Sequence, residues 1–315
     1  MIQEKELVQI PKCLNETELV PLEIWQIIDL RMIEAGIGGM VRNGEDSIFF
    51  EIEIKYDKVI DGYSLDGYSA RLLHIGEIKH ENVKGIDTAV IENTMRKIDW
   101  QKVTPEKLRD EPAAVIILDR LMELHATDDQ RGMDIAMLLA MKYFAGTHLG
   151  QVFDFSEARK NYETTLFIEL NGNRHDLSLP EAYQLLCGRG VAKSITPDGS
   201  SDTLCWMAMD KGKVVKTDDF DVIKYLSRLP FDKPRTVVQL AEDIAALSAG
   251  NQQLGRFRID NKVFHAYYEP DPLNGNIALR DLKQNKISLS DLKMTPELIS
   301  NLPRKKPEQS KGLGL

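Results

Sequence analysis

The most specific chemical pattern in the sequence is Glu53-Ile-Lys55, in which a carboxylate and a lysine are one residue apart. On a strand, residues with this spacing share a face. Many metal-dependent nucleases use such a pair, in which the carboxylate binds a divalent cation and the lysine orients or activates water. Asp57, Asp61 and Asp66 follow at the next turns and are candidates for the second carboxylate. Alternating charges also suit a solvated strand face, so a nuclease is the alternative interpretation.

A second pattern lies near the C-terminus, where aromatic and basic residues alternate. Rings of this kind stack on nucleic-acid bases while cations hold phosphates. In a strand, the same rings pack across a sheet and leave the arginines exposed. The candidate binding residues are Arg256, Arg258 and Tyr267, with Phe257, Phe264 and Tyr268 beside them.

Other catalytic or metal-binding signatures are missing from the sequence. The six histidines form neither a His-x3-His nor a His-Glu-x-x-His pair. The three cysteines, Cys13, Cys187 and Cys205, are odd in number and widely spaced, which argues against a disulfide framework or a zinc cluster. No phosphate-binding loop or serine nucleophile elbow occurs. We therefore expect no metal site and no cofactor.

Charge is unevenly distributed. Residues 1–160 contain 19 Lys+Arg and 29 Asp+Glu, a net of −10, whereas residues 161–315 contain 21 and 20, a net of +1. An acidic surface repels nucleic acid unless its cations cluster. A protein partner is therefore favoured, and nucleic acid is an option for the C-terminal half and the basic tail. No apolar run approaches the roughly 18 residues of a membrane span, and no secretory signal is present, so we expect a cytoplasmic protein without a membrane segment.

The hydrophobic patterns predict an α+β protein. In residues 1–162 we expect an acidic domain that begins with an amphipathic helix over 21–35, stopped by the glycines at 36–39. A strand over 47–56 and a second over 68–75 follow, joined through Asp-Gly turns at 61–62 and 66–67. Beyond residue 85 the domain is mostly helical. The four predicted helices cover 87–98, 112–125, 132–144 and 156–162.

Residues 163–292 are predicted to form a second α+β domain of hairpins and helices. Asn171-Gly172 is a strong hairpin signal. Ser178 and Glu181 have the spacing of a capping box before a helix that ends at Gly188 in the left-handed conformation. Arg189 then projects at the domain surface. A second capped helix covers 236–249 and a hairpin covers 255–268, and residues 293–315 are expected to be a small helix and a flexible basic tail.

One stretch of this second domain resembles a known family. The matching residues are Leu179, Ala182, Leu185, Leu186, Gly188, Arg189, Val191 and Lys193, followed by Trp206, Asp210 and the segment from Leu240 to Asn251. They are similar to uncharacterised domains in accessory proteins of Bacteroidetes conjugative and mobilisable elements. The resemblance covers roughly residues 164–290. It implies a mobile-element context and a binding role, and it adds Arg189 and Lys193 to the candidate binding residues.

The leading hypothesis is thus a cytoplasmic accessory protein that acts by binding a protein or a nucleic acid. The alternatives are a metal-dependent nuclease using Glu53, Lys55 and Asp61, or a structural, oligomerising component of an assembly. The sequence leaves the partner and the oligomeric state open.

Overall fold

In a computed structural model, the chain divides into two compact units, Met1–Leu186 and Cys187–Leu315. The described residues are 34–43, 45–57, 62–151, 153, 155–169, 177–195, 203–217, 219–259 and 262–288. Both helices and antiparallel sheets are present, as expected for an α+β protein. The division lies 24 residues beyond the boundary expected at 162/163.

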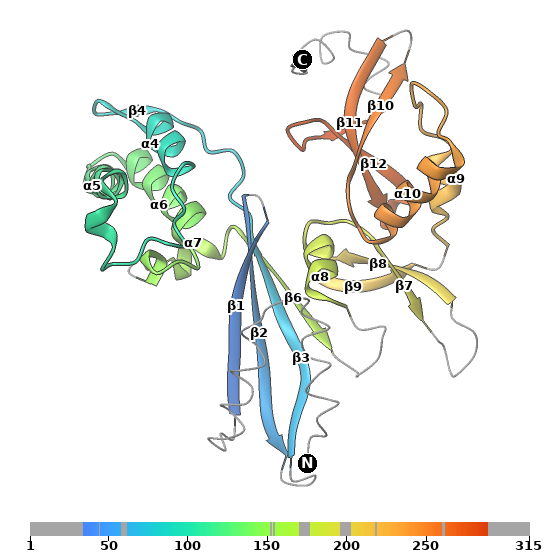
Figure 1. The fold of residues 1–315 in the computed structure, drawn as a ribbon, viewed down its shortest axis with the longest axis horizontal. Coiled ribbons are helices and arrows are strands. Elements are labelled where there is room, and N and C mark those ends of the chain that lie inside the picture. Colours follow the sequence, from blue (N-terminus) through green and yellow to red (C-terminus); the bar gives the residue numbers. More distant parts are fainter. Residues whose placement is uncertain are drawn as a thin grey trace, which may run out of the picture. The chain divides into compact units, whose positions relative to one another are not determined.

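The first unit contains a four-stranded antiparallel sheet in the order β1-β2-β3-β6 (Figure 1). Its strands are β1 (Glu34–Asn43), β2 (Asp46–Asp57), β3 (Gly62–Leu73) and β6 (Glu163–Glu169). The strand predicted over 47–56 is confirmed, and its alternation places Ile48, Phe50 and Ile52 in the core. On the other face, Arg71 of β3 lies 3.6 Å from Glu51 of β2.

The position of β6 explains why the division differs from the expected one. β6 pairs with β3, from Leu73↔Glu163 to Gly67↔Glu169, and so completes the first sheet rather than opening a second domain. Helix α8 (Leu179–Leu186) packs on the same sheet, and the Tyr183 hydroxyl donates to Asp46 Oδ2 at 2.8 Å. Periodicity identifies a strand but does not say which strand it pairs with.

Two glycine-rich segments lie within strands where the sequence predicts a helix end and a turn. Residues 34–39 belong to β1, and the rest of the predicted 21–35 helix lies outside the described residues. A Cβ at Gly39 would lie 2.3 Å from Cζ of Phe50, so the Phe50 ring occupies the space of the missing side chain. Gly67 lies inside β3, where a Cβ would lie 2.3 Å from the Ile168 carbonyl oxygen. In both places the absence of a side chain allows a neighbouring group to lie close to the strand backbone.

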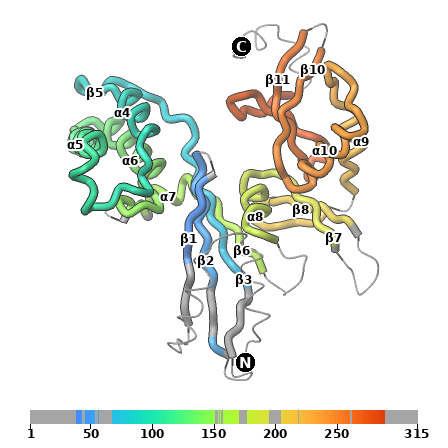
Figure 2. The backbone as a smooth tube through the Cα atoms, in the orientation of Figure 1, coloured from blue at the N-terminus to red at the C-terminus, as the bar shows by residue number. Residues whose placement is uncertain are grey.

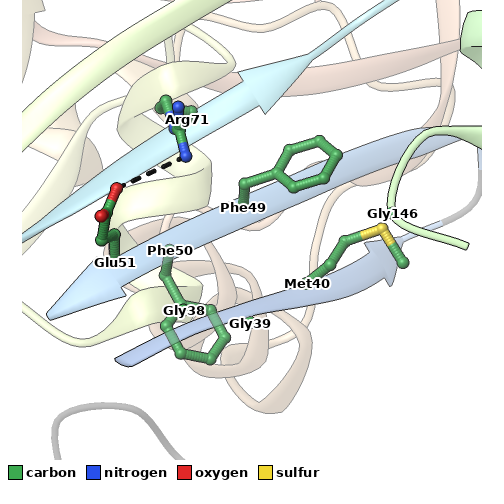
Figure 3. A pocket seen from close by; sticks show the side chains of 8 residues that line it. All are labelled: Gly38, Gly39, Met40, Phe49, Phe50, Glu51, Arg71 and Gly146. Carbon is green, nitrogen blue, oxygen red and sulfur yellow. Dashed lines mark ion pairs between the residues drawn. The ribbon is translucent and has the colours of Figure 1, made fainter. Parts of the chain in front are cut away.

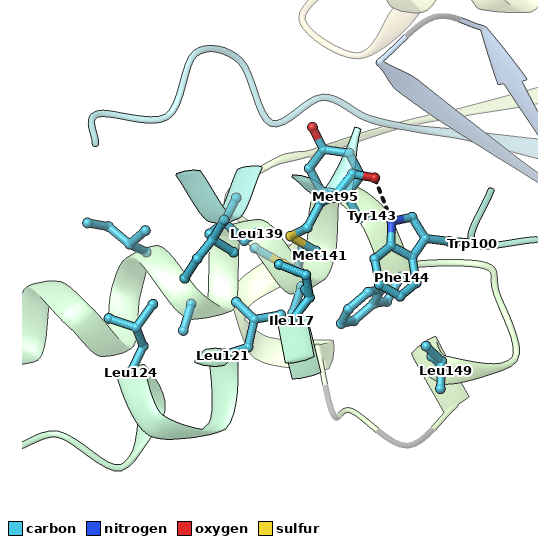
Figure 4. Close-up of a cluster of buried hydrophobic side chains, with 14 of the residues drawn as sticks. Met95, Trp100, Ile117, Leu121, Leu124, Leu139, Met141, Tyr143, Phe144 and Leu149 are labelled. Atoms are coloured by element: carbon cyan, nitrogen blue, oxygen red, sulfur yellow. Dashed lines mark hydrogen bonds between the residues drawn. The ribbon is translucent and has the colours of Figure 1, made fainter. Parts of the chain in front are cut away.

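Between β3 and β6 the chain forms a helical cluster (Figure 2). Its elements are β4 (Asn82–Val83), β5 (Ile86–Asp87), α4 (Thr88–Met95), η1 (Leu108–Asp110), α5 (Pro112–His125), α6 (Gln130–Phe144), η2 (Leu149–Gln151) and α7 (Ser156–Arg159). The four predicted helices are confirmed, although α4 and α7 are shorter than expected. Trp100, Leu124, Leu139 and Phe144 fill the core, where Trp100 Nε1 donates to the Met95 carbonyl oxygen at 2.9 Å (Figure 4).

The second unit contains two antiparallel sheets, β7-β8-β9 and β10-β11-β12-β13. The elements are β7 (Val191–Ile195), β8 (Thr203–Asp210), β9 (Lys213–Thr217), α9 (Val222–Leu226), α10 (Val237–Ser248), β10 (Gln253–Ile259), β11 (Lys262–Asp271), η4 (Pro272–Asn274), β12 (Asn276–Arg280) and β13 (Lys286–Ile287). The capping box of Thr236 and Gln239 on α10 is confirmed, as is the left-handed conformation of Gly188, whose φ is 78°. The predicted small helix and basic tail at 293–315 lie outside the described residues.

Among the helices of the described residues, none has the length and apolar character needed to cross a membrane.

Candidate functional site

The β10–β11 hairpin brings three of the predicted binding residues to one face. The register pairs Arg256 with His265 and Leu254 with Tyr267, and Tyr267 also pairs with Arg280 of β12. Residues that alternate along a strand share a face, so Arg258 lies on the same side. Arg256, Arg258 and His265 are exposed, whereas Tyr267 is half-buried. We call Leu254, Arg256, Arg258, His265, Tyr267 and Arg280 the arginine face.

The other aromatic residues of the predicted cluster point into the core. Phe257, Phe264 and Tyr268 are buried on the opposite side of the sheet, beneath α9 and α10. The Tyr268 hydroxyl donates to Asp243 Oδ1 at 2.7 Å, and burial, together with the hydrogen bond and charge of Asp243, raises the pKa of Tyr268. Of the predicted rings, only that of Tyr267 belongs to the open face.

A buried carboxylate holds the two arginines of β10. Residues 230–232 run beside β10, where Asp232 N donates to Arg256 O at 2.9 Å and Arg258 N donates to Pro230 O at 2.8 Å. The Asp232 side chain is only 3% exposed and lies 2.9 Å from Arg256 Nε and 2.5 Å from Arg258. Asp232 therefore fixes the direction in which both guanidinium groups leave the sheet.

A second buried carboxylate lies at the end of the arginine face. Glu269, whose side chain is 2% exposed, lies 3.0 Å from Arg189 Nε and 2.6 Å from Arg280 Nε. Gln252 Nε2 also donates to Glu269 at 2.5 Å. The expectation that Arg189 projects at the surface is therefore wrong, because this ion pair draws its side chain inward. The sequence patterns missed both Arg280 and Glu269. The signal that could have indicated Arg280 is its position on a strand next to Tyr267, and no local signal indicates Glu269.

Lys193, the fifth predicted binding residue, lies on β7 in the other sheet of this unit, where it pairs with Cys205. It is not part of the arginine face.

The net charge of the two units differs sharply. Residues 187–315 contain 20 Lys+Arg and 16 Asp+Glu, a net of +4, and residues 1–186 contain 20 and 33, a net of −13.

For the nuclease alternative, the structure describes only the backbone of the two central residues, Glu53 and Lys55. Glu53 and Lys55 lie on β2, opposite Gly36 and Glu34 of β1. Near Glu53, β3 carries one extra residue between the pairs Ile52↔Tyr68 and Ile54↔Leu65. Asp61 and the side chains of Glu53 and Lys55 lie outside the described residues. Within the described residues, no group of three His, Cys, Asp or Glu side chains is placed to hold a metal ion, and the nuclease stays a prediction.

The first unit contains a buried charge cluster around Glu92 of α4. Lys142 Nζ lies 3.0 Å from Glu92 Oε1, His80 Nε2 lies 2.6 Å from Oε2, and the Tyr143 hydroxyl donates to Oε1 at 3.0 Å. Burial acts to raise the pKa of Glu92, but the hydrogen bond and charge of Lys142, aided by His80 and Tyr143, lower it to about 2. The Lys142 and Glu92 side chains are 3% and 5% exposed, so this ion pair is sealed from solvent and stabilises the helices, and Arg96 at its edge is 52% exposed.

The first unit also has a hollow of about 400 Å³ beside β1 and β2 (Figure 3). Gly38, Met40, Phe49 and Gly146 contribute to its lining. Its charged groups are Arg71 and Glu51, which pair with each other. The hollow thus offers apolar walls without a converging set of polar groups.

No family model, no curated protein and no solved structure matches the chain. Its function is therefore argued from the site.

Proposed function

We propose that the protein acts by binding, and that its C-terminal unit holds an anionic partner on the arginine face. One observation carries this proposal. Two buried carboxylates, Asp232 and Glu269, hold arginines at one open side of a sheet.

The chemistry of the guanidinium group supports this interpretation. Arg256 contacts Asp232 through Nε, and a guanidinium has five N–H donors, so its outer nitrogens are turned toward solvent. Donors held in this way form charge-assisted hydrogen bonds to carboxylate or phosphate oxygens. Pairing of the buried carboxylates also contributes to stability, because a buried charge without a partner is costly. The Arg256 and Arg258 side chains nevertheless remain 56% and 49% exposed beyond those contacts.

The net charge of the units supports the same location. The +4 of residues 187–315 attracts an anion, and the −13 of residues 1–186 repels it. Attraction of this kind weakens as salt rises. Binding is therefore confined to the second unit and depends on ionic strength.

The experiment is retention of the full-length chain on immobilised heparin under a salt gradient. Arg256→Ala/Arg258→Ala should elute at clearly lower salt than the parent chain. Lys213→Ala/Lys216→Ala is the matched control, because it removes two exposed cations from β9 of the same unit. Equal shifts for the two double variants would mean that only net charge matters and would refute the arginine face.

The broader biological role belongs to the same proposal. The residues from Leu179 to Lys193 that resemble domains of mobile-element accessory proteins support a cytoplasmic accessory role in such an element. The nuclease alternative has its own test, which is Mg²⁺-dependent cleavage of DNA that disappears in Glu53→Ala and Lys55→Ala. The assembly alternative predicts a defined oligomer in native mass spectrometry.

A further inference from the structure

We infer that the anionic partner is a single-stranded nucleic acid, with its phosphates on the arginines and its bases against Tyr267 and His265. This inference rests on the proposed function and names the partner. Its basis is the arrangement of rings and cations in the register of β10, β11 and β12.

Along β10, two cations are held side by side. Arg256 and Arg258 are two residues apart on one face, which separates their Cα atoms by about 7 Å at roughly 3.4 Å per residue. Their guanidinium groups meet at the one Asp232 carboxylate. That carboxylate holds them together, and their remaining N–H donors are available to the phosphates of an extended strand.

Across the sheet, two rows place a ring beside a cation, whereas Arg258 pairs with Val263. Arg256 pairs with His265, and Tyr267 lies between Leu254 and Arg280. Directly opposed side chains have Cβ atoms about 4.5–5.5 Å apart, so a base that stacks on Tyr267 or His265 keeps its phosphate close to an arginine. Stacking of bases on aromatic rings depends little on base sequence. This mode of binding fits a face that has few groups able to hydrogen-bond to base edges.

The shape of the face favours a single strand over a duplex. The DNA major groove is about 12 Å wide and admits a two-stranded ribbon. Here β12 lies beside β11, and residues 230–232 lie beside β10, so the sheet is wider than a ribbon. An acidic peptide would use the arginines, but its aspartate and glutamate side chains offer no ring to stack on the half-buried Tyr267 or the exposed His265.

The experiment measures anisotropy of a fluorescein-labelled oligothymidylate of about 12 nucleotides, within the usual site size of roughly 4–16, with the full-length chain. Tyr267→Ser should weaken binding about tenfold, because stacking on one ring is lost, whereas Tyr267→Phe should bind like the parent. Arg256→Ala/Arg258→Ala should reduce the slope of log K against log salt by about 1.4, which corresponds to two phosphates of a single strand.

An abasic oligonucleotide of the same length separates base contacts from charge. It should bind the parent chain more weakly than oligothymidylate, and Tyr267→Ser should reduce that difference. Equal binding of both probes by the parent, or tighter binding of a duplex or of polyglutamate, would overturn the inference. If the chain is retained on heparin through Arg256 and Arg258 but ignores the oligonucleotide, the proposed function stands and the single-strand inference fails. If it is not retained on heparin either, both fail.

Discussion

Both units bury a carboxylate among cations, but they do so in different places. Glu92 of the first unit lies inside the helical cluster, with Lys142, His80, Arg96 and Tyr143 around it. Glu269 of the second unit lies at the end of an open sheet face. Its cations are Arg189 and Arg280.

The difference shows what each cluster can do. Lys142 is 3% exposed, so every donor that it offers is used inside the protein. In the second unit, Arg256 and Arg258 contact a buried carboxylate, but their side chains are 56% and 49% exposed. On the function proposed above, the first cluster serves stability, whereas the second positions donors for a partner.

The comparison requires that each cluster belong to its own folding unit, and truncation tests this with the largest expected effect. A chain that ends at residue 162 lacks β6 and α8 and exposes the apolar face that contains Phe50 and Tyr68. We expect it to lose cooperative thermal unfolding. A chain that ends at residue 186 should retain a sharp transition in circular dichroism, and similar melting of the two chains would contradict the division.

Removing one partner of the sealed cluster should have the next largest effect. Lys142→Met leaves Glu92 without its buried cation, and breaking a buried pair in this way costs about 3–5 kcal/mol. Urea unfolding should show this loss, while retention on heparin stays unchanged. Lys102→Met removes an exposed lysine of the same unit, paired with Asp99 at 2.8 Å, and should leave the urea transition nearly unchanged.

Acid should weaken the first unit more than the second. The pKa of Glu92 falls from its ordinary value of 4.5 to about 2 on folding. A lowered folded-state pKa stabilises the protein above pH 4.5, and this contribution declines as the pH falls toward 2. The free energy of unfolding from urea titrations should therefore drop across this window. For Glu92→Gln, the free energy of unfolding should be lower at neutral pH and should change less as the pH falls. If the plots of this free energy against pH are parallel for the variant and the parent chain, the role of Glu92 is refuted.

Removing the Glu269 carboxylate at the end of the arginine face should have the smallest effect on stability. Arg189 and Arg280 donate to different oxygens of Glu269. Glu269→Gln keeps an acceptor for only one of them, so we expect a loss of about 1–3 kcal/mol. Because one negative charge leaves the arginine face, the salt needed for elution from heparin should rise. Unchanged elution would mean that these two arginines do not face the partner.

The parts of the fold that sequence patterns predicted are those that depend on neighbours in the chain. Helix α5 begins at Pro112 and ends at His125, as predicted, because its start and stop signals lie within a few residues. The capping box of α10 is local for the same reason. At the candidate site, the alternation of β10 correctly predicted exposed arginines at 256 and 258 and a buried Phe257.

The parts that were missed depend on residues far apart in the chain. Arg189 and Glu269 are 80 residues apart, and no local pattern indicates that this ion pair draws the arginine inward. The same limit applies to β6, whose alternation predicts a strand but not its partner β3. The glycines of β1 look like a helix stop until the Phe50 ring is placed over Gly39.

The pairing of β3 with β6 has a topological consequence. Leu73 pairs with Glu163, and His74 N donates to Tyr162 O at 3.1 Å, so the chain leaves the sheet and returns to it at the same point. The whole helical cluster is thus an insertion into what would otherwise be the connection of a β-hairpin. Loop-closure entropy grows only with the logarithm of loop length, so such an insertion can grow, shrink or be exchanged in evolution while the strand register beneath it is kept.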